Sequence, residues 1–180
     1  MIRRATPADA AALAEVGRRT MIETFREDFA IPYPPADLAR FLDETHGAAA
    51  VAAQLADPAR TAWLAERDGA TVGYATIGPC KLPHPKVGRG DPELYQIYVT
   101  RAAQGAGLGR ALLDATLVEL ERPGRPIWLG VWSGNVRAQR VYAARGFREV
   151  GAYRFSVGDW LDDELILRRD PPGTAAAVSV

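Results

Sequence analysis

The segment between residues 94 and 120 places the strongest constraint on the fold, because it joins an apolar strand to an amphipathic helix through a glycine-rich turn. The strand covers residues 94–99, and the helix carries Leu108, Leu112 and Leu120 at helical spacing. Glycines let the backbone turn sharply, and free amides at a helix N-terminus favour an anion. This pattern predicts either a phosphate or pyrophosphate site or a purely structural turn. The turn consists of Gln104, Gly105, Ala106, Gly107, Leu108, Gly109 and Arg110.

Two nucleotide-binding motifs do not match this turn. The dinucleotide motif requires glycine or alanine where Arg110 stands, and it expects a tighter connection than residues 100–104 provide. The nucleoside-triphosphate loop requires a Gly-Lys-Ser/Thr sequence, which does not follow here. A nucleotide-binding module is therefore disfavoured.

The rest of the chain alternates short apolar strands with helices. A hairpin turns at Asp68-Gly69, and residues 79–92 form a loop rich in proline and glycine. This pattern predicts one mixed α/β domain over residues 1–170, followed by a flexible tail over residues 171–180. Strands are expected at residues 2–5, 61–66, 71–77, 94–99, 127–132, 147–157 and 161–167. Helices are expected at residues 7–25 (one long or two broken), 35–45, 48–55, 108–120 and 135–144.

Composition excludes several classes of function. The 22 basic residues balance 22 acidic ones, so a nucleic-acid partner is not expected. The chain has neither a signal peptide nor an apolar run long enough for a membrane helix, so we expect a soluble, cytoplasmic protein. One cysteine, Cys80, and two histidines, His46 and His84, make neither a disulfide framework nor a metal site.

Two motifs carry a family resemblance that covers residues 2–168. The pattern Gln104-x-x-Gly107-x-Gly109 after an apolar strand resembles the acyl-coenzyme A signature of the GNAT superfamily of N-acetyltransferases. A second pattern, Asn135-x-x-Ala138-x-x-x-Tyr142-x-x-x-Gly146-Phe147, is similar to the second conserved block of that superfamily.

A narrower resemblance points to the bacterial PaiA-like branch, whose members include polyamine acetyltransferases. It rests on Thr24-Phe25-Arg26, on residues 129–135 and on Phe155-x-x-Gly158. The resemblance implies the GNAT-type acyl-CoA N-acyltransferase fold, of the α/β (mixed α+β) class. Its central sheet is mostly antiparallel, with about seven strands flanked by helices. Strands 4 and 5, here residues 94–99 and 127–132, are parallel and splayed apart.

The resemblance also implies how acetyl-CoA is held. The amides of residues 104–110 would hold the pyrophosphate, with Arg110 adding charge. Main-chain groups of Ile97, Tyr98 and Val99 would pair with the pantetheine arm, and the Val99 amide would polarise the thioester carbonyl. Asn135 would cap its helix or bond the same arm.

Catalysis would then use Tyr142 as the acid that protonates the departing thiolate. The general base is open: Glu93 and Glu23 are candidates, and each also fits a solvated surface charge. His84 lies in the loop beside the expected acceptor mouth. Cys80 has no activating neighbour in the sequence and fits a small neutral residue better than a nucleophile.

We expect the acceptor to be a primary amine of a small molecule (polyamine-like, amino-acid-like or antibiotic amine) or of a peptide, attacked directly and without a covalent enzyme intermediate. The acidic residues of the N-terminal helices suit either a polyamine or an ordinary solvated face, while Tyr33, Trp132 and Tyr153 suit an apolar pocket. Trp160 or Leu161 would support a homodimer if exposed. The acidic residues are Glu23, Glu27, Asp28, Asp37, Asp43 and Glu44.

A coenzyme A-binding regulatory protein with little turnover is the alternative function.

Overall fold

The computed structural model describes residues 1–171, and residues 172–180 lie outside the described part of the chain. The strands are β1 (Ile2–Arg4), β2 (Thr61–Arg67), β3 (Ala70–Pro79), β4 (Pro92–Val99), β5 (Ile127–Trp132), β6 (Arg148–Val157) and β7 (Trp160–Arg169). The helices are α1 (Ala10–Met21), α2 (Pro35–His46), α3 (Ala48–Ala56), α4 (Leu108–Leu120) and α5 (Val136–Ala143). Shorter helical segments are η1 (Pro7–Asp9), η2 (Ile22–Asp28) and η3 (Arg101–Ala103).

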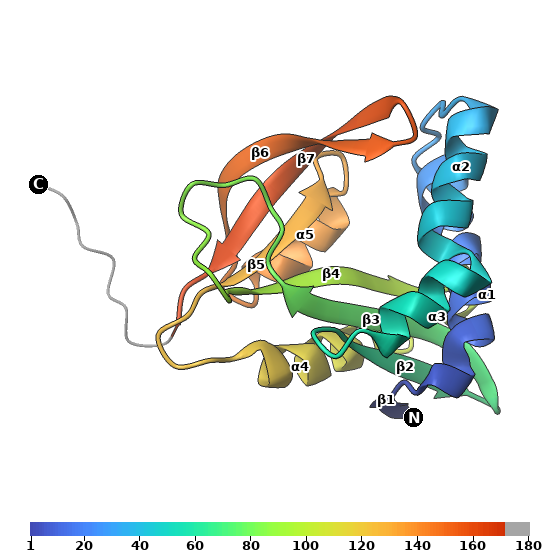
Figure 1. Ribbon diagram of the computed structural model, residues 1–180, viewed down its shortest axis with the longest axis horizontal. Helices are drawn as coiled ribbons and strands as arrows, with labels where there is room; N and C mark the ends of the chain where they lie inside the picture. Colours follow the sequence, from blue (N-terminus) through green and yellow to red (C-terminus); the bar gives the residue numbers. More distant parts are fainter. Residues whose placement is uncertain (172–180) are drawn as a thin grey trace, which may run out of the picture.

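One sheet contains the seven strands described for residues 1–171, in the order β1-β2-β3-β4-β5-β7-β6 (Figure 1). The β4–β5 pair is parallel, and the other five pairs are antiparallel. The connection between β4 and β5 contains α4, because parallel neighbours need a crossover. The predicted fold, mostly antiparallel with parallel strands 4 and 5, is confirmed.

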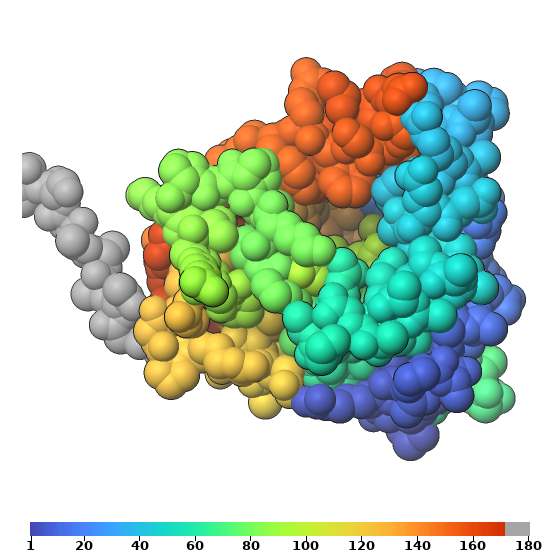
Figure 2. All heavy atoms as spheres, in the orientation of Figure 1, coloured from blue at the N-terminus to red at the C-terminus, as the bar shows by residue number. Residues whose placement is uncertain are grey.

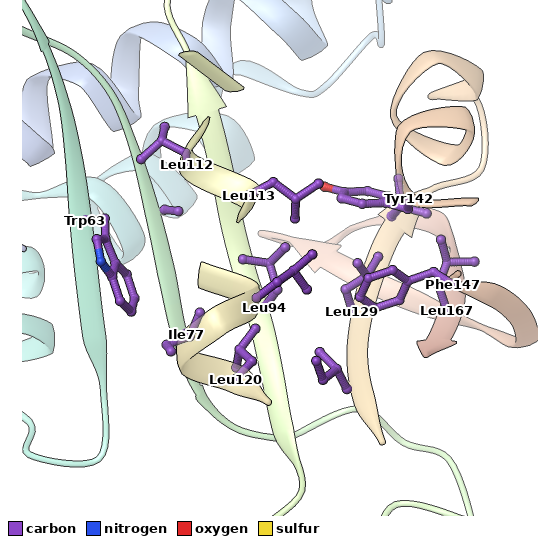
Figure 3. Close-up of a cluster of buried hydrophobic side chains, with 14 of the residues drawn as sticks. Trp63, Ile77, Leu94, Leu112, Leu113, Leu120, Leu129, Tyr142, Phe147 and Leu167 are labelled. Atoms are coloured by element: carbon purple, nitrogen blue, oxygen red, sulfur yellow. The ribbon is translucent and has the colours of Figure 1, made fainter. Parts of the chain in front are cut away.

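Helices cover both faces of the sheet. Side chains alternate along β2, so Trp63 and Ala65 join the core that α4 covers, while Ala62 and Leu64 join the core under α1 and α3. Figure 3 shows the first of these cores, which gathers leucines of α4 against β3, β4 and β5. The sheet is therefore a rigid middle layer on which site residues can be held.

The N-terminal helix does not break after α1 but continues as a π-helical segment. α1 runs directly into the π-helical η2, where the amide of Phe29 donates to the carbonyl of Thr24 at 3.0 Å, five residues back. The sequence left open one long helix or two broken ones, and the π-helical turn was not predicted. It places the ring of Phe25 at 6.3 Å from that of Tyr98 on β4.

Two further observations bear on the predictions for the whole chain. Within residues 1–171, no helix is long and apolar enough to cross a membrane. The tail predicted at residues 171–180 lies outside the described residues apart from Pro171.

Candidate active site

β4 and β5 start side by side and then separate. They are in register only at Glu93 with Trp128 and at Leu94 with Leu129, although the strands continue to Val99 and Trp132. On its other side β5 pairs along its whole length with β7. The sheet is therefore open between β4 and β5 beyond Leu94.

Main-chain groups of β4 line this gap. The amide of Thr100 donates to the carbonyl of Val72 on β3 at 2.9 Å. Because main-chain groups alternate in direction along a strand, those of Tyr98 face β3, while those of Ile97 and Val99 face the gap. An extended ligand with amide groups can pair with such an edge as an added strand does.

The glycine-rich turn follows the end of β4 and opens α4. Gly105 and Gly107 have φ angles of 82° and 77°, which residues other than glycine rarely adopt. A Cβ atom on either would meet nothing within 4 Å, so the turn is open to a ligand. Gly107 is the N-cap of α4, and the first amides of a helix have no intrahelical acceptor. This arrangement fits a pyrophosphate.

Two arginines flank this turn. The side chain of Gln104 spans the gap, because Nε2 donates to the Val99 carbonyl and Oε1 accepts from Arg137 of α5, each at 3.2 Å. Arg110 is exposed on the first turn of α4. Arg137 was not predicted from the sequence, although it stands two residues after Asn135 within the second motif.

α5 carries the second motif. Asn135 is its N-cap, and Oδ1 accepts a hydrogen bond of 3.0 Å from the amide of Ala138. The capping role proposed from the sequence is therefore present, and it leaves the side-chain NH₂ group of Asn135 for another partner. Asn135 and Tyr142 lie at opposite ends of α5, two turns apart, on one side of the helix.

The ring of Tyr142 is buried with its hydroxyl directed out of α5. The ring lies 6.0 Å from that of Phe147, and Figure 3 shows the hydroxyl pointing toward the α4 and β4 side of the gap. Burial, and then the charge of Glu164, raises the pKa of Tyr142 above its usual value, so the phenol is protonated at neutral pH.

A hollow lies on the face that carries the loop of residues 80–91. Figure 2 shows it framed by that light-green loop, by β6 and β7 in orange and by α2 in cyan, with yellow-green atoms of β4 at its base. The loop is fixed by Asp91, which accepts hydrogen bonds from the Gly88 amide at 2.8 Å and the Trp128 indole at 3.0 Å. The loop of residues 80–91 therefore forms an ordered wall of the hollow, and β4 forms its base.

Glu164 and Tyr153 form a hydrogen-bonded pair on this face. The hydroxyl of Tyr153 on β6 donates to Oε2 of Glu164 on β7 at 2.6 Å. Both groups lie over Gly130 of β5, because a Cβ atom there would be 2.7 Å from Glu164 Oε2 and 2.8 Å from Tyr153 Oη. Burial raises the pKa of Glu164 to about 7. From the sequence, Tyr153 is predicted only as a pocket aromatic, and Glu164 is not predicted because no motif contains it.

Glu93, the predicted base on β4, is turned into the loop of residues 80–91. Its Oε2 accepts the amide of Lys81 at 2.7 Å, and it also bonds the Cys80 thiol and the Leu82 amide. Burial raises the pKa of Glu93. The structure places this carboxylate near the site, engaged with the loop's main chain.

Glu23, the other candidate base, is held by arginines. Its Oε2 accepts a hydrogen bond of 2.7 Å from the amide of Arg101, and its Oε1 accepts one of 2.8 Å from the guanidinium of Arg19. Burial opposes ionisation of Glu23, but these hydrogen bonds outweigh it and lower the pKa. A carboxylate so stabilised is a weak proton acceptor.

Four of the other five acidic residues predicted for this face also have basic partners, and the exception within residues 1–171 is Glu44. Arg101 binds Glu27 at 2.8 Å and Asp28 at 2.7 Å, while Asp37 pairs with Arg40 and Asp43 with Arg18. Ion-paired carboxylates on a helix surface fit the solvated-face interpretation better than a free polyamine site.

The other residues considered from the sequence, two histidines, Cys80 and two aromatic residues, make contacts that stabilise the fold. His84 Nε2 contacts the Val150 carbonyl at 3.2 Å, so it joins the loop to β6. His46 is buried at the end of α2. Burial raises the pKa of the Cys80 thiol to about 12, so it stays protonated. Tyr33 bonds Asp162, and Trp132 packs on Phe29 with ring centroids 4.6 Å apart.

Comparison with known proteins agrees with this geometry. The profile of the acetyltransferase (GNAT) family matches residues 18–147. The chain belongs to this family. An uncharacterized N-acetyltransferase of Mycobacterium bovis is 33% identical over 170 residues, which cover 90% of this chain and 97% of the relative.

Solved structures of GNAT acetyltransferases have the same fold. PaiA N-acetyltransferase from Thermoplasma acidophilum, crystallised with coenzyme A, matches with a TM-score of 0.72 at 16% identity, over 94% of this chain and 98% of that one. A ribosomal-protein-alanine N-acetyltransferase from Brucella melitensis matches with a TM-score of 0.63 at 28% identity, over 94% and 99%. This GNAT enzyme is thus an acetyl-CoA-dependent N-acetyltransferase.

Proposed function

We propose that the enzyme transfers the acetyl group of acetyl-CoA to a primary amine of a small molecule or peptide, by direct attack within a ternary complex. The separation of β4 from β5 carries this proposal, because it leaves main-chain groups of β4 without a β5 partner beyond Leu94. A pantetheine arm paired with them would connect the anion cradle of residues 104–110 to the hollow of Figure 2. Acetyl donor and amine would meet in the gap.

The donor would be held mainly by main-chain groups. The amides at the start of α4 bind the pyrophosphate, with Arg110 and Arg137 adding charge. The edge formed by Ile97 and Val99 pairs with the amides of the pantetheine arm. The Val99 amide then donates to the thioester carbonyl oxygen, where negative charge develops during acyl transfer.

Tyr142 acts as the acid in this proposal. Its hydroxyl is directed to the α4 and β4 side of the gap, and its raised pKa keeps the proton in place until a strong base appears. The departing thiolate of coenzyme A is such a base, so Tyr142 protonates the leaving sulfur.

Direct attack is favoured over an acyl-enzyme. The chain has one cysteine, Cys80. Burial raises the pKa of its thiol to about 12. A thiol must ionise to act as a nucleophile. Its partner Glu93 adds negative charge, which opposes ionisation further.

The acceptor is a primary amine whose identity a screen will decide. Relatives differ in the acceptors that their names state, among them mycothiol in a Frankia casuarinae enzyme and the alanine of a ribosomal protein in an Escherichia coli enzyme. The PaiA-like branch adds polyamines to the set, on the motifs around Phe25 and Phe155.

The test is release of free thiol from acetyl-CoA in the presence of polyamines, amino acids, aminoglycosides or peptides with free N-termini. Amine-dependent release, with the acetylated amine identified by mass spectrometry, is the expected result. Tight coenzyme A binding in calorimetry without turnover on any amine would instead support a regulatory protein. Thermal stabilisation by ATP or NAD but not by coenzyme A would oppose both.

A further inference from the structure

We infer that Glu164 is the proton acceptor for the amine, that Tyr153 positions it, and that the hollow takes the acceptor as a primary ammonium. This inference rests on the proposed function. An ammonium has no lone pair for attack, so an acetyltransferase must remove one proton at or near the site. The question is which carboxylate near the gap has an oxygen available for that proton.

Most carboxylates around the hollow already use both oxygens or bind the loop's main chain. Asp162 accepts from Tyr33 on one oxygen and from the Trp160 indole on the other. Asp91 accepts from Gly88 and Trp128 on Oδ2 and from Arg125 on Oδ1. Glu93 holds the amides of residues 81 and 82. Protonating any of these would break contacts that fix the walls of the hollow.

Glu164 differs because its hydrogen bond comes from a side chain, the hydroxyl of Tyr153, and not from the main chain of the loop. Oε2 accepts the hydroxyl of Tyr153, whereas Oε1 has no donor among residues 1–171. The side chain is only partly buried. The hydrogen bond fixes the carboxylate, and the second oxygen remains free to receive a proton.

The position of Glu164 follows from a missing side chain on β5. β5 lies between β7 and the gap, and its residue at this point is Gly130. A Cβ atom there would come within 2.8 Å of both Glu164 and Tyr153, far inside van der Waals contact. Because glycine leaves this space, the carboxylate of Glu164 lies over β5, the strand that borders the gap. Its charge acts on Tyr98 of β4 and on Tyr142 of α5, which border the gap.

The proposed reaction conserves atoms and charge at each step. Glu164 accepts one proton from R–NH₃⁺, and the freed lone pair forms the C–N bond to the acetyl carbon as the C–S bond breaks. Tyr142 gives its phenolic proton to the sulfur. The second proton lost by the nitrogen restores Tyr142 through water, and Glu164 releases its proton to solvent. The net products are the amide, coenzyme A and one proton.

Groups from several elements face Glu164 and set the pH at which it works. They are Tyr33, Tyr153 of β6, Asp162 of β7, Glu93 and Tyr98 of β4, and Tyr142 of α5. Burial raises the pKa of Glu164 to about 7, with Asp162 and Glu93 acting in the same direction and the Tyr153 hydrogen bond acting against them. A base with such a pKa is partly ionised at neutral pH and still binds a proton well.

The test is the pH profile of kcat/KM for the best amine, from about pH 5 to about pH 9. Wild type should show an ionisation near pH 7. Glu164→Gln should lower kcat/KM roughly 100-fold and remove this ionisation, leaving only the rise that comes from the amine itself. Tyr153→Phe removes the hydrogen bond that lowers the Glu164 pKa, so the ionisation should move to higher pH.

Asp163→Asn is the matched control, because Asp163 is the preceding residue of β7 and lies exposed in an ion pair with Arg154. It should leave rate and profile unchanged. The inference is overturned if Glu164→Gln keeps the ionisation near pH 7, if Tyr153→Phe leaves it unmoved, or if Glu93→Gln is the change that removes it. Absence of amine-dependent thiol release by wild type would contradict the proposed function instead.

Discussion

Tyr153 and Glu164 stand directly opposite each other in the β6–β7 ladder, joined by a 2.6 Å hydrogen bond from phenol to carboxylate. The register of the sheet brings the Cβ atoms of such cross-strand neighbours close together, so their side chains can interact directly. The pair extends over Gly130 toward the gap between β4 and β5. The hairpin of β6 and β7 thereby places the proposed proton acceptor, Glu164, beside the gap between β4 and β5.

Gly130→Ala should therefore impair catalysis more than binding of the donor. The new Cβ atom would lie 2.7 Å from Glu164 Oε2 and 2.8 Å from Tyr153 Oη, so the pair must move. We expect kcat/KM for the amine to fall at least about 10-fold, because misplacing a reacting group by a fraction of an ångström is costly. Calorimetry should show unchanged coenzyme A affinity. A full rate in this variant would show that the pair's position does not matter.

Tyr142→Phe should lower kcat by roughly 100-fold, the usual contribution of a positioned acid. Coenzyme A affinity should change little, because the cradle consists of main-chain amides and arginines. The raised pKa of Tyr142 also predicts that no loss of acid form appears below about pH 10 in the wild-type profile. Stopped-flow measurement of thiol release checks the rate, and an unchanged rate would remove Tyr142 from the acid role.

Gly107→Ala and Gly124→Ala form a matched pair for the anion cradle. Both glycines have positive φ, 77° and 71°, and a Cβ atom on either meets nothing within 4 Å. Each substitution should cost about 1 kcal/mol of stability through backbone strain alone. Only Gly107→Ala should weaken coenzyme A binding, because Gly124 lies in the turn after α4. Equal affinities for the two variants would argue against the cradle.

His46 should make the fold sensitive to acid. It is buried and close to Gly17, and burial lowers its pKa to about 4 from an ordinary value of 6.5. A folded pKa below the unfolded one favours the neutral ring, so its stabilising contribution is present above pH 6.5 and is lost as the pH falls toward 4. The loss is at most about 3 kcal/mol. Urea denaturation at several pH values should show a shallower dependence for His46→Gln.

Most helices and strands, and the two family motifs, could be read from the sequence because they depend on local patterns. Glycines at residues 105 and 107 specify their own turn, and the apolar spacing of α4 specifies its buried face. Family membership and the parallel pairing of β4 with β5 followed from these motifs and are confirmed.

The proton acceptor could not be predicted for a physical reason. Glu93 has the right residue type beside the gap, but its hydrogen bonds to the loop are visible only once residues 80–82 are folded back on it. Glu164 becomes a candidate only because Gly130, on a different strand, leaves it room. Neither fact is encoded in a local spacing.

Initial velocities measured over a grid of acetyl-CoA and amine concentrations test direct transfer in the gap. The account predicts intersecting double-reciprocal lines, because donor and amine must be bound together, and Cys80 unmodified by mass spectrometry after incubation with acetyl-CoA alone. Parallel lines, or an acetyl group on Cys80, would contradict it by showing that the acetyl group passes through the enzyme.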